Sequence, residues 1–210
     1  MTQYRKNIEK VLSSTKKIWN PPPDLTVSEW SDQYRVLSAE SSSEAGQWKT
    51  DRAPYQKEIM DAANDHRINT IVFMKSAQVG ATEILNNIVG YFIDQDPSPT
   101  LVLQPTLAMA QAWSKDRLAN MIRDSERLRT KVKDPKSRDS GNTVLSKKFP
   151  GGNINIVGSN SPAGLASRPI RILLCDEVDR YETSAGAEGD PINLAVKRTT
   201  TFWNRKVFIT

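Results

Sequence analysis

The stretch that most constrains this 210-residue chain runs from Thr70 to Asp94. It opens with a β-rich apolar run at 70–74, breaks at a small-residue turn over 75–82, and resumes with helical spacing. The apolar residues of this second part recur on one helical face: Ile84, Leu85, Ile88, Val89, Phe92 and Ile93. We therefore predict a strand, a tight loop and a helix, in which the N–H groups of the loop and the positive end of the helix converge on an anion.

The loop departs from the standard phosphate-binding pattern G-x-x-x-x-G-K-[ST]. Gly80 and Thr82 keep the second glycine and the hydroxyl, whereas Ala81 occupies the lysine position and Lys75 replaces the first glycine. Because the chemistry requires a cation near the β- and γ-phosphate oxygens, Lys75 can supply it from the front of the loop. Taken alone, the loop is better explained as a strand–turn–helix with a surface lysine.

A second motif follows the run from Ile170 to Cys175, which is continuously apolar apart from Arg171 and typical of a strand buried on both faces. It ends in Asp176-Glu177. Two acids at the end of such a strand predict a site in which Asp176 holds Mg²⁺ together with Thr82, and Glu177 polarises the attacking water. The alternative interpretation is an ordinary strand end that faces solvent. It would account for one acidic residue but less well for two in succession.

Tyr55 and Gln56 precede the loop, at the start of a predicted helix over 56–64. A glutamine amide can pair with a donor and an acceptor on an adenine edge, and a tyrosine can stack on the base. A helix N-terminus with a packed tyrosine explains this pair equally well.

The remaining elements place both motifs in one sheet. Strands are predicted at 100–103 and 206–210, and helices at 106–125, capped by Thr106 with Leu107 facing inward, and at 191–200. Runs at 142–149 and 153–157, joined by Pro-Gly-Gly, predict a β-hairpin insertion. We predict an α/β fold of the P-loop NTPase class, with a mostly parallel central sheet, helices on both faces and the ligand at the carboxyl edge. The chain stops inside its last predicted strand, so we expect a fragment.

Residues 1–50 are expected to form an N-terminal arm and an extended loop that pack on an ATPase domain at 51–210. The arm contains an amphipathic helix at 1–19 and a proline spacer at 21–23, a short helix follows that is capped by Thr26 or Ser28, and Trp48 anchors the loop. Residues 129–140 are basic and predict a solvated loop or a DNA-facing one.

Composition excludes several classes. One Cys and one His exclude a disulfide framework and a Cys/His zinc site. No apolar run approaches the roughly 20 residues that a spanning helix needs, so no membrane partner is expected. A net charge of +5 is compatible with nucleic acid without requiring it.

Several ordered blocks, from about residue 26 to the end, resemble the large subunit of lambda-type phage terminases. They are the loop Lys75–Thr82, the upstream residues Glu29-Trp30, Gly46-x-Trp48, Pro54-Tyr55-Gln56 and Ile59-Met60, and the segment 158–164 leading into 173–180. The resemblance implies the ATPase portion, of the additional-strand, catalytic-glutamate type, that moves double-stranded DNA into a procapsid. It implies ATP and Mg²⁺ as ligands, the small subunit and the portal protein as partners, a homo-oligomeric ring, and the host cytoplasm as location.

The resemblance also implies residue roles. Lys75 and Glu177 are catalytic, Thr82 and Asp176 hold the metal, and Thr210 begins the coupling motif. The implied ATP-binding residues are Tyr55, Gln56, Lys75, Ser76, Ala77, Gln78, Val79, Gly80, Ala81 and Thr82.

Two departures from the family pattern matter. Many terminases carry an arginine in the loop where this chain has Gln78, so the transition-state arginine must come from elsewhere, and Arg168, in cis or from a neighbouring subunit, is the candidate. The C-terminal nuclease domain has no counterpart here, so this chain is not expected to cut DNA. A helicase-like translocase, and a DNA-binding or assembly module without turnover, remain alternatives.

Overall fold

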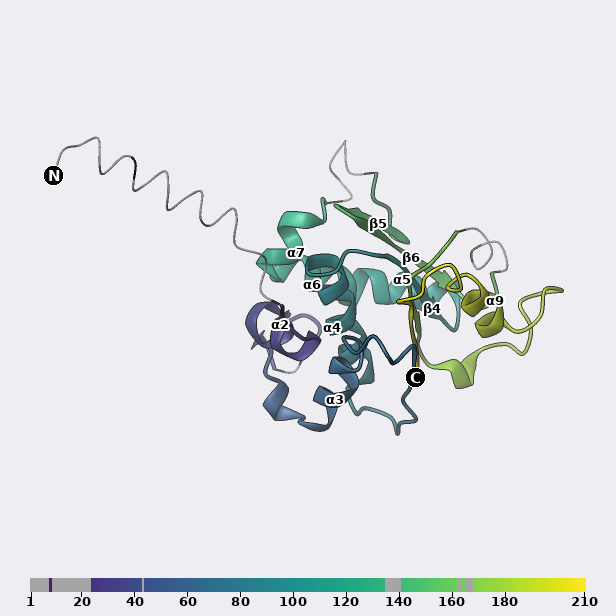
Figure 1. Ribbon diagram of the computed structural model, residues 1–210, viewed down its shortest axis with the longest axis horizontal. Coiled ribbons are helices and arrows are strands. Elements are labelled where there is room, and N and C mark those ends of the chain that lie inside the picture. Colours follow the sequence, from purple (N-terminus) through teal and green to yellow (C-terminus); the bar gives the residue numbers. More distant parts are fainter. Residues whose placement is uncertain (1–7, 9–23, 43, 135–140, 162–163, 165–167) are drawn as a thin grey trace.

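The computed structural model describes residues 8, 24–42, 44–134, 141–161, 164 and 168–210. Its centre is a six-stranded sheet in the order β3-β8-β7-β4-β6-β5 (Figure 1). The strands are β3 (Thr70–Val72), β4 (Pro99–Gln104), β5 (Ser146–Phe149), β6 (Gly152–Gly158), β7 (Ile172–Cys175) and β8 (Lys206–Ile209). Neighbouring strands are parallel except β5 and β6. The predicted α/β fold with a mostly parallel sheet is therefore confirmed.

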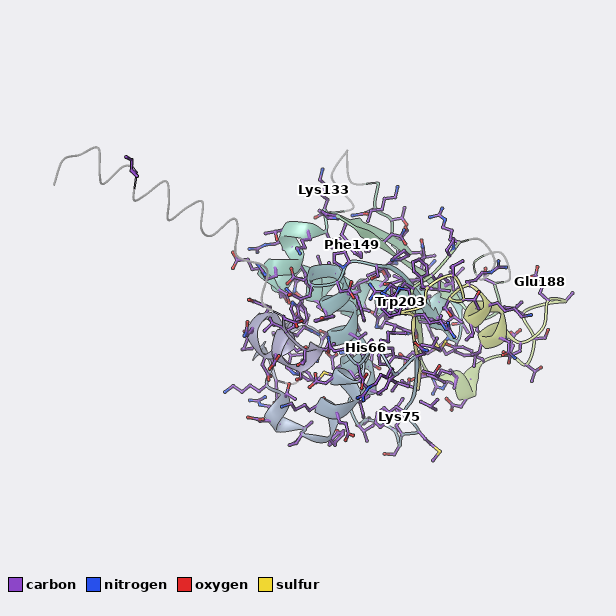
Figure 2. The ribbon with its side chains drawn as sticks, in the orientation of Figure 1. His66, Lys75, Lys133, Phe149, Glu188 and Trp203 are labelled. Atoms are coloured by element: carbon purple, nitrogen blue, oxygen red, sulfur yellow. The ribbon has the colours of Figure 1, made fainter. Side chains whose placement is uncertain are left out.

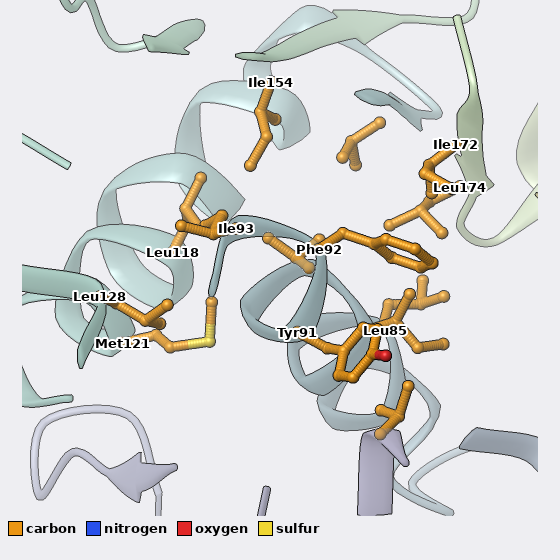
Figure 3. Close-up of a cluster of buried hydrophobic side chains, with 14 of the residues drawn as sticks. Leu85, Tyr91, Phe92, Ile93, Leu118, Met121, Leu128, Ile154, Ile172 and Leu174 are labelled. Atoms are coloured by element: carbon orange, nitrogen blue, oxygen red, sulfur yellow. The ribbon is translucent and has the colours of Figure 1, made fainter. Parts of the chain in front are cut away.

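Helices cover both faces of this sheet (Figure 1). One face carries α2 (Val27–Tyr34), α3 (Tyr55–Asp61), α4 (Ala81–Asp94), α5 (Leu107–Ala112), α6 (Ala119–Asp124) and α7 (Glu126–Lys131), and the other carries α9 (Pro191–Lys197). Successive strand residues point to opposite faces. Val102 and Leu174 accordingly join the larger cluster around α4, part of which Figure 3 shows, whereas Leu101 and Leu173 pack with α9.

Helix α4 lies at the centre of the larger cluster and is buried on nearly all sides, including Asn86, Asn87 and Gly90. The sequence indicated a single apolar face. The difference arises because α2, which precedes α4 in the chain, covers the side away from the sheet: Trp30 lies against Gly90, and its indole N–H donates to Asp94 Oδ2 at 2.9 Å. Lys131 Nζ lies 2.7 Å from the other carboxylate oxygen, so the buried charge of Asp94 is paired.

The predicted helix over 106–125 forms as three consecutive segments: α5, the π-helical turn η2 (Trp113–Leu118) and α6. Thr106 caps it by accepting from the Met109 N–H at 3.2 Å, as predicted. The inward placement of Leu107 was wrong, since this side chain is 48% exposed. It occupies the first helical position, where Cβ points back toward the helix N-terminus and beyond the elements that cover the rest of the helix.

The extended loop expected within residues 1–50 includes order that the sequence did not indicate. Gly46–Gln47 (β2) pairs antiparallel with Val36–Leu37 (β1), and Thr50–Arg52 form the short helix η1. Trp48 is buried, as its anchoring role requires. Thr26 is the cap of α2, in a capping box with Glu29. The helix predicted at 1–19 and the proline spacer lie outside the described residues.

The remaining segments differ from expectation in small ways. Helix α3 ends at Asp61, earlier than predicted. The predicted hairpin forms as β5 and β6, but β6 also pairs with β4 and is a full member of the central sheet. Within the part of the chain that the structure describes, no helix has the length and apolar character needed to cross a bilayer.

Candidate functional site

The loop from Phe73 to Gly80 connects the carboxyl end of β3 to the start of α4. Gln78 (φ 60°) and Gly80 (φ 78°) both adopt left-handed backbone conformations, which turn the chain from strand to helix. No side chain caps the N-terminus of α4, so its first N–H groups are not used by a capping residue. This is the arrangement that favours an anion at a helix N-terminus.

Three neighbouring strands of the sheet meet at Asp176, which is 3% exposed. Its Oδ1 accepts from the Thr210 hydroxyl at 3.0 Å, after β8, and its Oδ2 accepts from Gln104 Nε2 at 3.2 Å, at the end of β4. An ionised carboxylate offers about four lone-pair sites, so both oxygens can still accept another ligand. Sequence reasoning singled out Asp176 and Thr210 but not Gln104, although its position as the last residue of a strand beside β7 was visible.

Glu177 adopts a left-handed backbone conformation with φ 54°, which is uncommon for a residue with a side chain. Such conformations cost about 1–3 kcal/mol and gather at functional sites. The carboxylate, 32% exposed, accepts from Arg180 Nη1 at 3.0 Å. The ion pair at this turn therefore joins Arg180 to Glu177.

Glu177 lines two cavities at the carboxyl edge. The larger, of about 490 Å³, is shared with Lys75, Ser76, Ala77, Arg180 and Thr210. The smaller, of about 240 Å³, is shared with Thr82, Gln104, Arg117 and Asp176. The two ends of the loop, Lys75 and Thr82, are thus both brought to Glu177. Figure 2 shows Lys75 at the lower edge of the molecule, where Figure 1 places the carboxyl terminus.

Tyr55 and Gln56 contact the same atom of the loop, the carbonyl oxygen of Val79. The Tyr55 hydroxyl donates to it at 2.8 Å and Gln56 Nε2 at 3.1 Å. Gln56 is 4% exposed, and its Oε1 has no hydrogen-bond partner among the described residues. It lines a cavity of about 220 Å³ together with Leu37, Trp48, Arg52 and Gly80. A buried acceptor without a donor suits a ligand that carries an amino group, such as adenine.

The other predicted site residues are distributed unevenly. Ser76, Ala77 and Gln78 are exposed on the loop, Val79 is half-buried, and Ala81 is buried at the start of α4. Arg168 lies before β7, at the amino edge of the sheet, with the whole strand between it and Asp176, a span of about 13 Å for four residues. The structure therefore does not bring Arg168 to the site within one chain.

Buried groups beside the site have shifted pKa values. Burial raises the pKa of the Cys175 thiol, so the cysteine stays protonated and is not a candidate nucleophile. Burial also raises the pKa of Tyr181, whose hydroxyl donates to the Leu103 carbonyl at 2.9 Å. Both groups therefore stay uncharged at neutral pH.

The donor set suits Mg²⁺ in the way nucleotide sites usually hold it. The described residues contain no group of three or more His, Cys, Asp or Glu side chains placed to bind a metal. Mg²⁺ is commonly held by one or two carboxylates together with substrate phosphates. Asp176 and Thr82 line one cavity, which places a carboxylate and a hydroxyl together there.

Comparison with known proteins identifies one family. The model of the phage terminase large subunit gpA ATPase domain matches residues 42–210. The chain is 29% identical over 178 residues to the terminase large subunit of Enterobacteria phage P21, and 28% identical over 189 residues to that of Escherichia phage lambda. These alignments cover 84% and 90% of this chain but 27% and 29% of the relatives.

A solved structure resembles the fold. The crystal structure of the HK97 bacteriophage large terminase superposes with a TM-score of 0.64 at 12% identity, over 88% of this chain and 37% of that chain. At this identity the likeness concerns the fold alone.

Proposed function

Since this chain belongs to the family of phage terminase large subunit gpA ATPase domains, we propose that it binds ATP with Mg²⁺ at the carboxyl edge of the sheet and hydrolyses it. In the context of a full-length protein, this hydrolysis drives double-stranded DNA into a procapsid. The observation that carries the proposal is the position of Glu177, which lines one cavity with Lys75 and an adjoining one with Thr82 and Asp176.

Each side chain has a defined task in this proposal. The Lys75 ammonium holds phosphate oxygens, and Glu177 orients the attacking water and draws its proton as the oxygen attacks the γ-phosphorus. Mg²⁺, held by Asp176 and Thr82, neutralises the charge of the phosphates when bound. Gln104 and Thr210 hold the Asp176 carboxylate through hydrogen bonds to its two oxygens.

The base of the nucleotide is assigned to the cavity beside Gln56. In this proposal, Gln56 Oε1 accepts a hydrogen bond from the adenine amino group. Because Tyr55 and Gln56 also donate to the Val79 carbonyl, binding of the base is linked to the position of the loop. The loop residues Ser76 to Thr82 supply backbone and hydroxyl contacts to the phosphates.

The wider assembly is also part of the proposal. The relatives are several times longer than this chain, so DNA cleavage is assigned to a nuclease domain of the longer protein. The partners are double-stranded DNA, the terminase small subunit, the portal protein and further copies of the same subunit in a ring. The location is the host cytoplasm, with transient docking on the procapsid.

The test is Mg²⁺-dependent binding of ATP to the chain, measured by calorimetry with the wild type and Lys75→Ala. Loss of a charge-assisted contact predicts an affinity at least about tenfold weaker for Lys75→Ala. Lys133→Ala is the matched control, since it removes the same charge at the end of the molecule opposite Lys75 (Figure 2) and should leave the affinity unchanged. A wild type that binds no ATP, or a Lys75→Ala variant with wild-type affinity, contradicts the proposal.

A further inference from the structure

The loop that faces the phosphates carries a single cation. Between Lys75 and Thr82, every other side chain is uncharged, including Gln78. Phosphoryl transfer spreads negative charge over the transferred group, and a second cation, commonly an arginine, is what enzymes of this chemistry place against it. The cavity that contains Thr82, Asp176 and Glu177 is where such a cation would act.

Arg117 is positioned at this cavity. Among the described residues that line it, Arg117 is the only lysine or arginine, and it shares this cavity of about 240 Å³ with the acids Asp116, Asp176 and Glu177. Removing three negative charges from their water by binding a polyanion is unfavourable without a compensating cation. Among the described lining residues, Arg117 is the protein's own positive charge at this cavity, beside the Mg²⁺ that the proposed function assigns to Asp176 and Thr82.

The guanidinium of Arg117 uses only part of its hydrogen-bonding capacity within the protein. Its Nη1 donates to the Ser41 carbonyl and lies 3.7 Å from Glu83 Oε1, and the side chain is 42% exposed. A guanidinium has five donors, so most remain available to a ligand. Arg35 shows the contrast: its side chain is 4% exposed and its Nη2 is 2.8 Å from Glu83 Oε2. Glu83 therefore forms a close ion pair with Arg35, whereas its distance to Arg117 is too long for a hydrogen bond.

Arg117 belongs to the π-helical turn η2. In a π turn the backbone hydrogen bonds join residues five apart, and here Trp113 and Leu118 are both buried. Asp116 and Arg117, which lie between them in the chain, line the cavity together with Trp113 and Thr82. Such turns are frequent at functional sites.

We propose that Arg117 is the in-cis arginine of this site, and that it contacts the phosphates of bound ATP in the role that position 78 lacks. The inference rests on the proposed ATPase function. When the water oxygen bonds to the γ-phosphorus, the bond to the bridging oxygen breaks and the negative charge moves onto ADP. Arg117 stabilises that charge and neither gains nor loses a proton, whereas Glu177 receives the proton of the water.

The test compares Arg117→Ala with Arg123→Ala. Both arginines contact the segment 38–41, Arg117 through the Ser41 carbonyl and Arg123 through the Ser38 hydroxyl and Glu40, but only Arg117 lines the cavity. The measurements are calorimetric affinities for Mg²⁺-ADP with and without aluminium fluoride, which mimics the transferred phosphoryl group, and kcat. The first readout does not depend on turnover.

We expect Arg117→Ala to keep its ADP affinity within a few-fold but to lose the gain in affinity that aluminium fluoride gives the wild type, with kcat lowered by about a thousandfold. Arg117→Gln, which keeps much of the aliphatic part of the side chain, should behave like Arg117→Ala. Arg123→Ala should behave like the wild type.

If aluminium fluoride raises the ADP affinity of Arg117→Ala as much as it raises that of the wild type, the inference about Arg117 is overturned. The ATPase proposal is then left intact. Equal losses in Arg123→Ala and Arg117→Ala also overturn it, because they would assign both arginines to holding the segment 38–41. A wild type that binds no ADP or ATP overturns both proposals.

Discussion

The hydroxyl of Thr210 donates a hydrogen bond to Oδ1 of Asp176 at 3.0 Å, which joins the end of β8 to the acid that follows β7. The backbone strengthens this junction, because the Thr210 carbonyl accepts from the Val178 N–H at 2.9 Å. One residue earlier, the Ile209 carbonyl accepts from the Phe73 N–H at 2.8 Å, just before Lys75. Residues 209–210 therefore contact both segments that the proposed chemistry uses.

Thr210→Val is predicted to raise the Mg²⁺ concentration needed for ATP hydrolysis by about 10- to 100-fold, because valine keeps the shape but removes one of the two donors that orient Asp176. The measurement is a Mg²⁺ titration of steady-state hydrolysis. Thr210→Ser retains the hydroxyl and should restore the wild-type requirement. A Thr210→Val variant with an unchanged Mg²⁺ dependence would show that the hydrogen bond does not support the metal site.

Glu177→Gln is predicted to keep nucleotide affinity and to lower kcat by roughly 10²- to 10⁴-fold, the usual contribution of a positioned general base. The amide oxygen can still accept from Arg180, so the local structure should persist. Glu182→Gln, in the exposed segment that follows, is the matched control and should hydrolyse ATP normally. Normal turnover in Glu177→Gln would remove this residue from the mechanism.

Gly80→Ala is predicted to weaken ATP binding and to lower thermal stability. Its φ is 78°, and an added Cβ would collide with Nε2 of Gln56. Gly189→Ala separates the two causes, because Gly189 also has a positive φ, of 97°, but nothing lies within 4 Å of the point that its Cβ would occupy. Gly189→Ala should therefore lower the Tm without changing nucleotide affinity.

The contact between Gly80 and Gln56 can be tested in the same experiment. If the collision with the amide matters, the double variant Gly80→Ala/Gln56→Ala should lose less stability than the sum of the two single variants. Additive losses would assign the whole effect of Gly80→Ala to backbone strain.

The Asp94 carboxylate is predicted to make the free energy of unfolding decrease as the pH falls into the acid range. Burial favours the neutral form, but hydrogen bonds from Lys131, Trp30 and Gln95 outweigh it and hold the pKa of Asp94 below its usual value. A depressed folded-state pKa stabilises the protein above the unfolded value of about 3.9, and this contribution is lost as pH falls through the lower folded value.

Asp94→Asn should accordingly lower the free energy of unfolding at pH 7 and flatten its dependence on pH below about 4, as measured by urea denaturation at a series of pH values. Asp51→Asn, an exposed carboxylate, is the control and should keep the wild-type profile. An Asp94→Asn variant with an unchanged acid profile would show that this carboxylate does not contribute to the pH dependence.

The amino-acid sequence by itself determined the class of fold and the edge of the sheet at which the candidate site residues would gather. Periodicity placed α4 and the strands β4, β7 and β8, because the period of apolar residues follows directly from helix and strand geometry. The order of the two motifs predicted that Lys75, Thr82, Asp176 and Glu177 would meet, because parallel strands present their carboxyl ends at one edge.

Only the tertiary structure decided which residues surround that edge. Gln104 and Arg117 became candidates when β4 and η2 were placed beside β7, and Arg168 lost its in-cis role because β7 separates it from Asp176. These contacts join residues far apart in the chain, and their geometry depends on packing between elements, which leaves no local periodic signal in the sequence. The sequence therefore specifies the loop around Lys75, whereas the packing of η2 on α4, where Trp113 Nε1 donates to Asn86, brings Arg117 to the cavity that Thr82 and Asp176 line.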